Sequence, residues 1–386
     1  MDKIVSNNEL TSFQPEQWKY TSLNLLKNYN SNFIPQNKGL NKKINPNEII
    51  IYNGKIIGYG EKIKSKNIQI YNINEALEKN INDVNALFNK ISTKNQNIFI
   101  QHNTNNHNGG YYLFISSGLE LMDTIKIKNI IDQGDENSFL NYRNFIHCEK
   151  NVTATILNEE IYLINQCINI VCETHIDKNT KLEIINHSEK PNTKQIYNFY
   201  GCIKQNSKLN HHVLDISGNL LKNNYYIDLE ESGSEYLFNG LNISNHKQHY
   251  DNYIQINHNS PHTISNLNYK IIANQNSKSI LFAKSIINKN SFNSEAYQKN
   301  NNLILSDKAR VHSNPQLEIY NDDVKCSHGS ATGQIDDDAI YYMRTRGIDE
   351  QTAKKLILNS FIDEIINQIP ESKIQDNLKH IIKHYL

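Results

Sequence analysis

The sequence of 386 residues has few arginines and no long apolar run. Only 4 of its 40 basic residues are arginine, and 40 acidic residues balance them, so the formal net charge is zero. This balance disfavours a strongly basic nucleic-acid-binding protein. No stretch approaches the roughly 18 apolar residues that span a bilayer, and the first residues lack the apolar segment of a secretory signal. We therefore expect a soluble cytoplasmic protein with neither nucleic acid nor membrane as a partner.

Cysteine is also scarce, and several sequence motifs of enzymes are missing. The five cysteines form an odd, dispersed set without a C-x-x-C pair, which disfavours a disulfide scaffold or a zinc knuckle. We expect four of them to be core residues: Cys148, Cys167, Cys172 and Cys202. The chain contains no G-x-x-x-x-G-K-[ST], G-x-G-x-x-G, G-x-S-x-G or H-E-x-x-H motif. The sequence therefore gives no sign of a phosphate-binding loop, a nucleophile elbow or a zinc protease site.

Four histidines lie in polar segments of the sequence. His102 and His107 fall in QHNTNNHNGG, and His211 and His212 are adjacent. None of them has a metal-ligand partner at a meaningful spacing. We interpret all four as loop residues.

Apolar residues make up only 38% of the chain, and asparagine rather than charge fills the remainder. Because low charge does not produce disorder, we expect a folded chain of two to three domains. Residues 1–95 have the mixed pattern of an α+β, α-rich N-terminal region. Residues 22–29 and 83–91 carry apolar side chains at helical spacing. Asn53-Gly54 is a type I′ turn signal between isoleucine-rich runs and predicts a hairpin over residues 49–60.

Residues 96–334 have the pattern of an all-β core. Short runs that alternate apolar and polar side chains, such as 98–100, 112–115 and 225–229, are separated by Asn, Gly, Ser or Lys. No amphipathic helix lies between them, which argues against a βαβ fold. A sandwich and a solenoid both remain. The length of the region and the asparagines at its turns favour the solenoid, although no strict repeat is visible.

Residues 335–386 predict a C-terminal helical subdomain. Asp336 starts an acidic first turn, and Gly347 stands where a helix C-terminal glycine belongs. A second helix starts at Asp349 and carries Leu356 and Phe361, and a third starts near Glu371. Three short helices bury little apolar surface among themselves, so they must pack on the body of the protein or on a partner.

The segment 324–328 carries the candidate metal ligands. On a strand, Val324, Cys326 and His328 project to one side, about 6.5 to 7 Å apart. Cys326 and His328 could then offer a thiolate and an imidazole to one iron or cluster. His312, in the preceding strand, could be a neighbour, although a structural role is favoured for it. The alternative is that Cys326 is a small core residue and His328 a turn residue. Since clusters usually have four ligands, such a site would need ligands from another chain.

The stretch 316–348, QLEIYNDDVKCSHGSATGQIDDDAIYYMRTRGI, resembles the signature of the SufB/SufD family of iron–sulfur cluster assembly proteins. Within it, the Lys-Cys-Ser-His-Gly run at 325–329 and the Arg-x-Arg-Gly run at 344–347 are similar to the SufD branch. Shorter matches follow the family order: EQWKYT at 16–21, FNGL at 238–241, PHT at 261–263, AYQ at 296–298 and LSD at 305–307. The resemblance covers roughly the last 160 residues well.

The resemblance implies a right-handed parallel β-helix core and a protein that is not an enzyme. It implies a scaffold subunit that pairs with SufB and with the ABC-type ATPase SufC. A transient iron–sulfur cluster would form in the complex, and no cofactor would be tightly bound to this chain alone. The isolated chain could form a homodimer.

The resemblance also implies roles for particular residues. His328 would lie at the SufB interface and take part in cluster assembly, with Cys326 a weaker candidate. The SufB side would include Val311, His312, Leu317, Ile319 and Val324, and the SufC side Leu356 and Phe361.

Two other functions are alternatives to a scaffold subunit with a metal site. The chain could be a purely structural interaction subunit with no direct metal contact. A β-helix polysaccharide lyase or hydrolase would need a secretion signal and carboxylates on one face. Adjacent carboxylates such as Glu230 and Glu231 project to opposite faces of a strand, which disfavours that reading.

Overall fold

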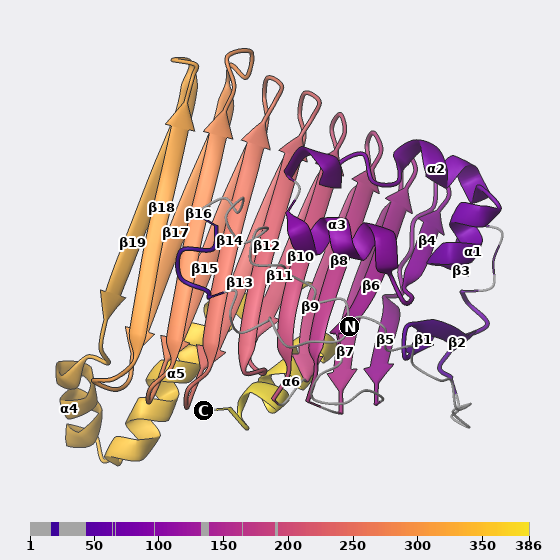
Figure 1. The fold of residues 1–386 in the computed structure, drawn as a ribbon. Helices are drawn as coiled ribbons and strands as arrows, with labels where there is room; N and C mark the ends of the chain where they lie inside the picture. The colour runs from indigo at the N-terminus through magenta and orange to yellow at the C-terminus, as the bar shows by residue number, and fades with distance from the viewer. Residues whose placement is uncertain are drawn as a thin grey trace.

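Two facing sheets of mainly parallel strands form the body of the protein. The computed structural model describes residues 17–22, 44–63, 65, 67–95, 97–132, 139–163, 165–189 and 192–385. From β4 onward, successive strands alternate between the two sheets, so the chain winds as a parallel β-solenoid of about seven turns (Figure 1). The predicted β-helix core is therefore confirmed.

The first sheet runs from β19 at one end to β2 at the other. Its strands are β1 (Glu48–Tyr52), β2 (Lys55–Tyr59), β5 (Ile125–Ile131), β7 (Thr153–Tyr162), β9 (Lys181–Glu189), β11 (Lys208–Asp215), β13 (Glu235–Ser244), β15 (Ile264–Ala273), β17 (Ser294–Ile304) and β19 (Val324–Gly333). The second sheet runs from β18 to β3. Its strands are β3 (Ile68–Asn72), β4 (Tyr111–Ile115), β6 (Phe139–Cys148), β8 (Cys167–Ile176), β10 (Lys194–Ile203), β12 (Leu220–Leu229), β14 (His249–His258), β16 (Lys278–Ile287) and β18 (Arg310–Ile319).

Alternate side chains of each strand fill the space between the sheets. The inner faces form one long apolar core in which aromatic rings stack from strand to strand. Phe238 of β13 and Tyr269 of β15, for example, lie parallel with ring centroids 6.1 Å apart. Cys148, Cys167, Cys172 and Cys202 are buried, as predicted. Burial raises the pKa of Cys148 and of Cys172 to about 12, so both remain thiols at neutral pH.

Asparagines occupy the turns between strands, as the sequence predicts. Asn151, Asn179 and Asn206 adopt the left-handed conformation, with φ of 59°, 58° and 54°. Their amides also bond from turn to turn, since Asn179 donates to Asn151 at 3.2 Å. The turns differ in length: Lys194 pairs with Leu220 but Lys278 pairs with Arg310, so the repeat is 26 residues in one turn and 32 in another. This variation hides the repeat in the sequence.

The two ends of the solenoid differ. At one end, β2 pairs antiparallel with β1, and β3 pairs antiparallel with β4. The β1–β2 hairpin turns at Asn53-Gly54, whose φ values of 47° and 81° confirm the predicted turn. At the other end, β18 and β19 are the edge strands of their sheets, ten residues each. Pro315 in β18 fits an edge strand, because proline has no backbone N–H to donate to a neighbouring strand.

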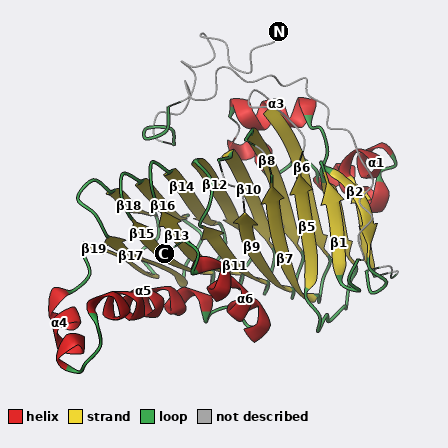
Figure 2. Ribbon diagram, turned by 90° about the horizontal axis from the view of Figure 1, so that it is seen from below, coloured by secondary structure: helices red, strands yellow, loops and turns green. Residues whose placement is uncertain are grey.

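Helices pack on parts of the outer faces of both sheets (Figure 2). They are α1 (Ile73–Glu78), η3 (Ile81–Asp83), α2 (Val84–Leu87), η4 (Ser92–Asn95), α3 (Ile98–Asn106), α4 (Asp337–Thr345), α5 (Glu350–Ile366) and α6 (Ser372–Ile382). The strand predicted at 98–100 is wrong, since these residues begin α3. Asn97 caps that helix by accepting from the backbone N–H groups of Phe99 and Ile100. The predicted helix at 22–29 lies outside the described residues.

The three C-terminal helices start where the sequence predicts. Asp336 and Asp349 cap α4 and α5 through their side chains, and Gly347 has φ 88°. The apolar faces of α5 and α6 pack on the outer face of β7, β9, β11, β13 and β15. On α5 the buried residues include Leu358 and Ile362, whereas Leu356 is 45% exposed. The subdomain therefore docks on the body and still presents apolar side chains outward.

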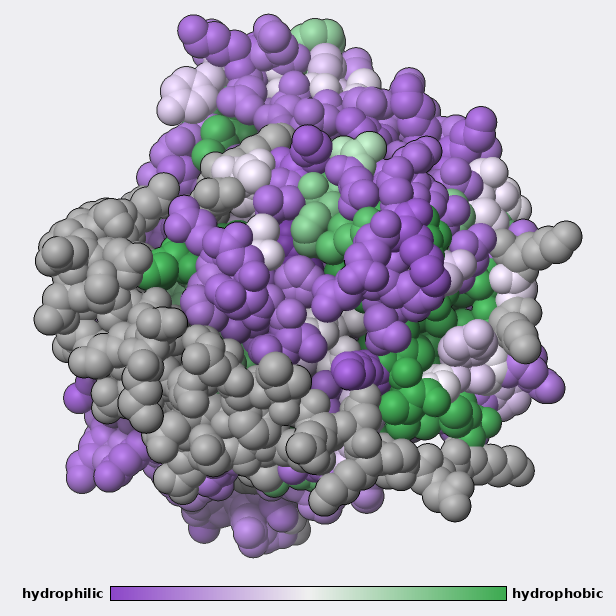
Figure 3. Space-filling model, turned by 45° about the vertical axis from the view of Figure 1, so that its right-hand side comes forward, coloured by the Kyte–Doolittle hydropathy of each residue, from purple (hydrophilic) through white to green (hydrophobic). Residues whose placement is uncertain are grey.

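Hydrophilic side chains dominate the coloured surface in Figure 3, with hydrophobic ones in smaller patches between them. Within the described ranges, none of the helices combines the length and the apolar character that crossing a membrane requires.

Candidate functional site

The candidate site is the inner side of the last solenoid turn, formed by β18 and β19. The two strands face each other, and the Ser330 hydroxyl donates to the Ser313 hydroxyl across the interior at 2.8 Å. Because side chains alternate along a strand, this contact fixes which residues point inward. They are Val311, Ser313, Pro315, Leu317 and Ile319 from β18, and Val324, Cys326, His328, Ser330 and Thr332 from β19.

Cys326 and His328 therefore share one face, as predicted. Cys326 is half-buried and stands in register with Ala296, whereas His328 is exposed and stands in register with Gln298. Both would belong to the core if another turn followed β19. The site is thus an unfinished piece of solenoid interior.

Polar groups line the solenoid beneath this site. Gln298 is buried and donates to the Ser285 hydroxyl at 2.8 Å and to the backbone oxygen of Gln316 at 3.2 Å. Asn302 donates to the Thr332 hydroxyl at 2.9 Å. This network fixes the last turn against the one before it. Sequence reasoning missed it, because the paired residues are 13 to 30 positions apart.

Cys326 and His328 are the two candidate metal ligands at this site. Burial raises the pKa of Cys326, so its sulfur is mainly a thiol at neutral pH. In the described part of the chain, no three His, Cys, Asp or Glu residues gather in a way that could hold a metal ion. Cys326 and His328 could supply two ligands to a metal, provided that a partner supplies the others.

His312 does not join the other two candidates. It lies on the outer face of β18, where its ring stacks on Tyr20 with centroids 5.0 Å apart. Of the residues predicted to face a partner, Val311, Leu317, Ile319 and Val324 point into the open last turn. Ile319 is 46% exposed, which is high for an isoleucine on an inward-facing position.

Leu356 and Phe361 line one pocket of about 390 Å³ between α4, α5 and the ends of β17 and β19. Phe361 also packs against Lys270, whose ammonium nitrogen lies 4.1 Å from the ring centroid. The apolar part of the lining also includes Met343 of α4, Leu303 of β17, Ile335 and Ile357. The two residues predicted for an ATPase interface therefore share one concave surface.

The four histidines predicted as loop residues lie elsewhere. His102 is in α3 and His107 follows its last turn. His211 and His212 are both buried on β11, where His211 bonds Tyr236 and His212 bonds Glu183 at 2.9 Å. The loop prediction is therefore wrong for His102, which is in a helix, and for His211 and His212, which are on a strand with both faces buried. Polar residues can occupy such strands when they are hydrogen-bonded.

Comparison with known proteins adds the family. Residues 130–361 match the model of the SufBD core domain of the SUF system for FeS cluster assembly, which is more than half of the chain. The chain belongs to the SufB/SufD family.

Individual relatives of the SufB/SufD family agree. The chain is 28% identical to a SufBD family iron–sulfur cluster assembly protein of Synechocystis over 55% of its length and 48% of the relative. It is 25% identical to the iron–sulfur cluster assembly protein SufD of Escherichia coli over 64% of its length and 59% of the relative. It is 22% identical to SufD of Plasmodium berghei over 82% of its length and 23% of the relative. The matches to the first two relatives span about half of each. Each of these relatives is an iron–sulfur cluster assembly protein.

Proposed function

We propose that this chain is a SufD-type scaffold subunit that has no turnover of its own. It pairs with a SufB-like sister scaffold through β18 and β19, and with a SufC-like ATPase through α4 and α5. The observation that carries the proposal is the unfinished last turn. Two ten-residue edge strands meet there around a partly apolar inner face, which includes Cys326 and His328.

Physical chemistry supports pairing at this end. A long, uncovered edge strand presents unpaired N–H and C=O groups, and another strand can add to it. A partner strand beside each edge would bury Ile319 and Leu317 and would also cover His328. Ligands from the partner would then stand next to Cys326 and His328, where a transient cluster could form.

The test is the mass of the complex in solution. The chain is co-expressed with the SufB and SufC homologues of its host, and light scattering measures the mass of the size-exclusion peak. We expect one peak with one SufB, two SufC and one copy of this chain. A second test is Leu317→Asp, which places a charge on the inner face of the last turn and should remove the SufB homologue from the peak. A wild-type chain that elutes alone would contradict the proposal.

A further inference from the structure

A short N-terminal segment, residues 17–22, lies on the outer face of the second sheet. We call it the strap. Trp18 packs on Phe99 of α3 with ring centroids 5.1 Å apart, and Tyr20 stacks on His312 of the edge strand β18. The strap thus crosses the sheet from α3 to the open end of the solenoid. Figure 1 draws it in indigo, in front of the strands coloured orange.

Buried groups hold the strap in place. The Thr21 hydroxyl donates to the Asp251 carboxylate and bonds His249 Nε2 at 3.0 Å. Asp251 also accepts from Lys222 at 3.0 Å, and both of these side chains are almost fully buried. Thr21 therefore completes the hydrogen bonding of a buried ion pair, and this contact fixes the position of Thr21 on the sheet. Lys19 and Tyr20 are therefore held between two anchors, Trp18 and Thr21.

The part of the strap next to β18 is positively charged. The Tyr20 ring lies near two ammonium groups, Lys19 Nζ at 5.4 Å and Lys278 Nζ at 5.3 Å from its centroid. Arg310 stands in register with Lys278 at the start of β18. Burial and the charges of Lys278 and Lys19 lower the pKa of His312, in agreement with this arrangement. Two ammonium groups thus flank one aromatic ring at the edge of the sheet.

A strand added to β18 would run about 4.8 Å from it. Its outward side chains near Arg310 and His312 would then reach Tyr20 and Lys19. Since the local charge is positive, the favoured neighbour is an acidic side chain.

We propose that the strap is part of the partner interface, where Lys19 and Lys278 receive an acidic side chain from the strand that the sister scaffold adds to β18, and where the Tyr20 ring holds the two ammonium groups in place. The inference rests on the proposed function, because it needs a partner strand at this edge. It deepens that function by naming the chemistry that selects the partner.

Titration calorimetry with the purified SufB homologue tests the inference. Tyr20→Ala should weaken binding about tenfold, and Lys19→Glu at least as much. Tyr20→Phe keeps the ring and should bind like the wild type. Tyr59→Ala is the matched control, because Tyr59 is 41% exposed on β2 at the opposite end of the solenoid. Added salt should weaken wild-type binding more than it weakens binding by Lys19→Glu.

The outcomes separate the two proposals. If the wild type binds and both Tyr20→Ala and Lys19→Glu bind equally well, the strap inference is wrong and the proposed function stands. If the wild type does not bind, the proposed function fails. If the strap variants instead disrupt a homodimer of this chain, the assignment of the acidic strand to a sister scaffold is overturned. Lys19 is exposed, so Lys19→Glu gives the answer even if Tyr20→Ala unfolds.

Discussion

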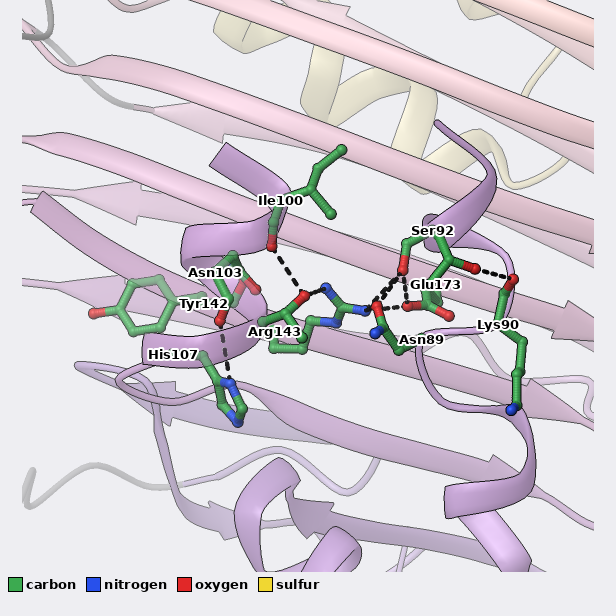
Figure 4. Close-up of polar contacts among 11 residues, drawn as sticks. Asn89, Lys90, Ser92, Ile100, Asn103, His107, Tyr142, Arg143 and Glu173 are labelled. Atoms are coloured by element: carbon green, nitrogen blue, oxygen red, sulfur yellow. Dashed lines mark hydrogen bonds and ion pairs between the residues drawn. The ribbon is translucent and has the colours of Figure 1, made fainter. Parts of the chain in front are cut away.

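Arg143 and Glu173 form an ion pair with no exposure to solvent on the outer face of β6 and β8 (Figure 4). The Ser92 hydroxyl donates to Glu173 at 2.7 Å, and Arg143 donates to Asn89 at 3.3 Å. The Arg143 guanidinium also lies 4.7 Å from the centre of the Phe88 ring. The pair therefore fastens the segment from Phe88 to Ser92 onto the solenoid.

Removing one member of this pair should destabilise the protein strongly. Arg143→Ala leaves the Glu173 carboxylate buried without its charge partner, and we expect a loss of about 3 to 5 kcal/mol in the free energy of unfolding. Urea denaturation measures it. The control is Lys62→Ala, which breaks an exposed pair with Asp123 and should cost below about 1 kcal/mol. Equal effects of the two variants would contradict this account.

Stability should fall as the pH drops below neutral, in part because of His211. Burial lowers the pKa of His211 to about 3, so it stays neutral in the folded protein while the unfolded chain binds a proton below about pH 6.5. Between pH 7 and pH 5, this one group removes about 2 kcal/mol. His211→Gln should show a shallower decline in urea denaturation over that range. His380→Gln, at an exposed position, should decline like the wild type.

Gly240 should not tolerate a side chain. A Cβ there would lie 2.3 Å from the Tyr269 ring and 2.9 Å from the Phe238 ring, and both rings are fully buried. We expect Gly240→Ala to cost about 1 to 3 kcal/mol through overpacking. Gly329→Ala adds the same methyl group where no atom lies within 4 Å, and it should be nearly neutral. Thermal unfolding compares the two, and a neutral Gly240→Ala would show that the rings can move.

Leu356→Asp should abolish binding of the ATPase without unfolding the chain. Leu356 is exposed, so the charge costs little stability, but it would stand in the pocket that we propose for the ATPase. Co-purification with the SufC homologue measures the loss. Asn359→Asp adds the same charge at an exposed position of α5 outside the pocket lining. If both variants still bind, the ATPase docks elsewhere.

His328→Ala should reduce cluster formation in the reconstituted complex. We expect the iron and sulfide content per complex to fall by more than half, because the ligand that we propose at the interface with the sister scaffold is lost. Ser327→Ala is the control, since Ser327 projects to the other side of β19. Full cluster content in the His328 variant would favour the purely structural subunit.

The sequence predicted the strands, the turns and the C-terminal helices where the local pattern is decisive. Alternation placed Cys326 and His328 on one face, and the caps at Asp336 and Asp349 marked helix starts. Residues 98–100 were misassigned because a run of three apolar residues fits a strand and a helix equally well. The local signal that decides between them is Asn97, whose side chain caps the helix by accepting from the N–H groups of Phe99 and Ile100.

Contacts between distant segments could not be predicted in the same way. Tyr20 and His312 are in contact although they are far apart in the sequence, and the local pattern around either residue does not predict this contact. His211 looked like a loop residue because it is polar, yet Asn186 and Tyr236 satisfy both of its ring nitrogens inside the core. The sequence therefore predicted that Cys326 and His328 lie on one face of a strand. It did not predict the polar network beneath them or the strap beside them.

The unequal ends of the solenoid limit how such chains can join. An end closed by antiparallel strands, as at β2 and β3, offers no continuation of the parallel winding, whereas β18 and β19 do. A subunit with two open ends would polymerise into a fibre. When two subunits with one open end each pair through these strands, neither keeps a free parallel edge strand of this kind, so end-to-end association stops at a pair.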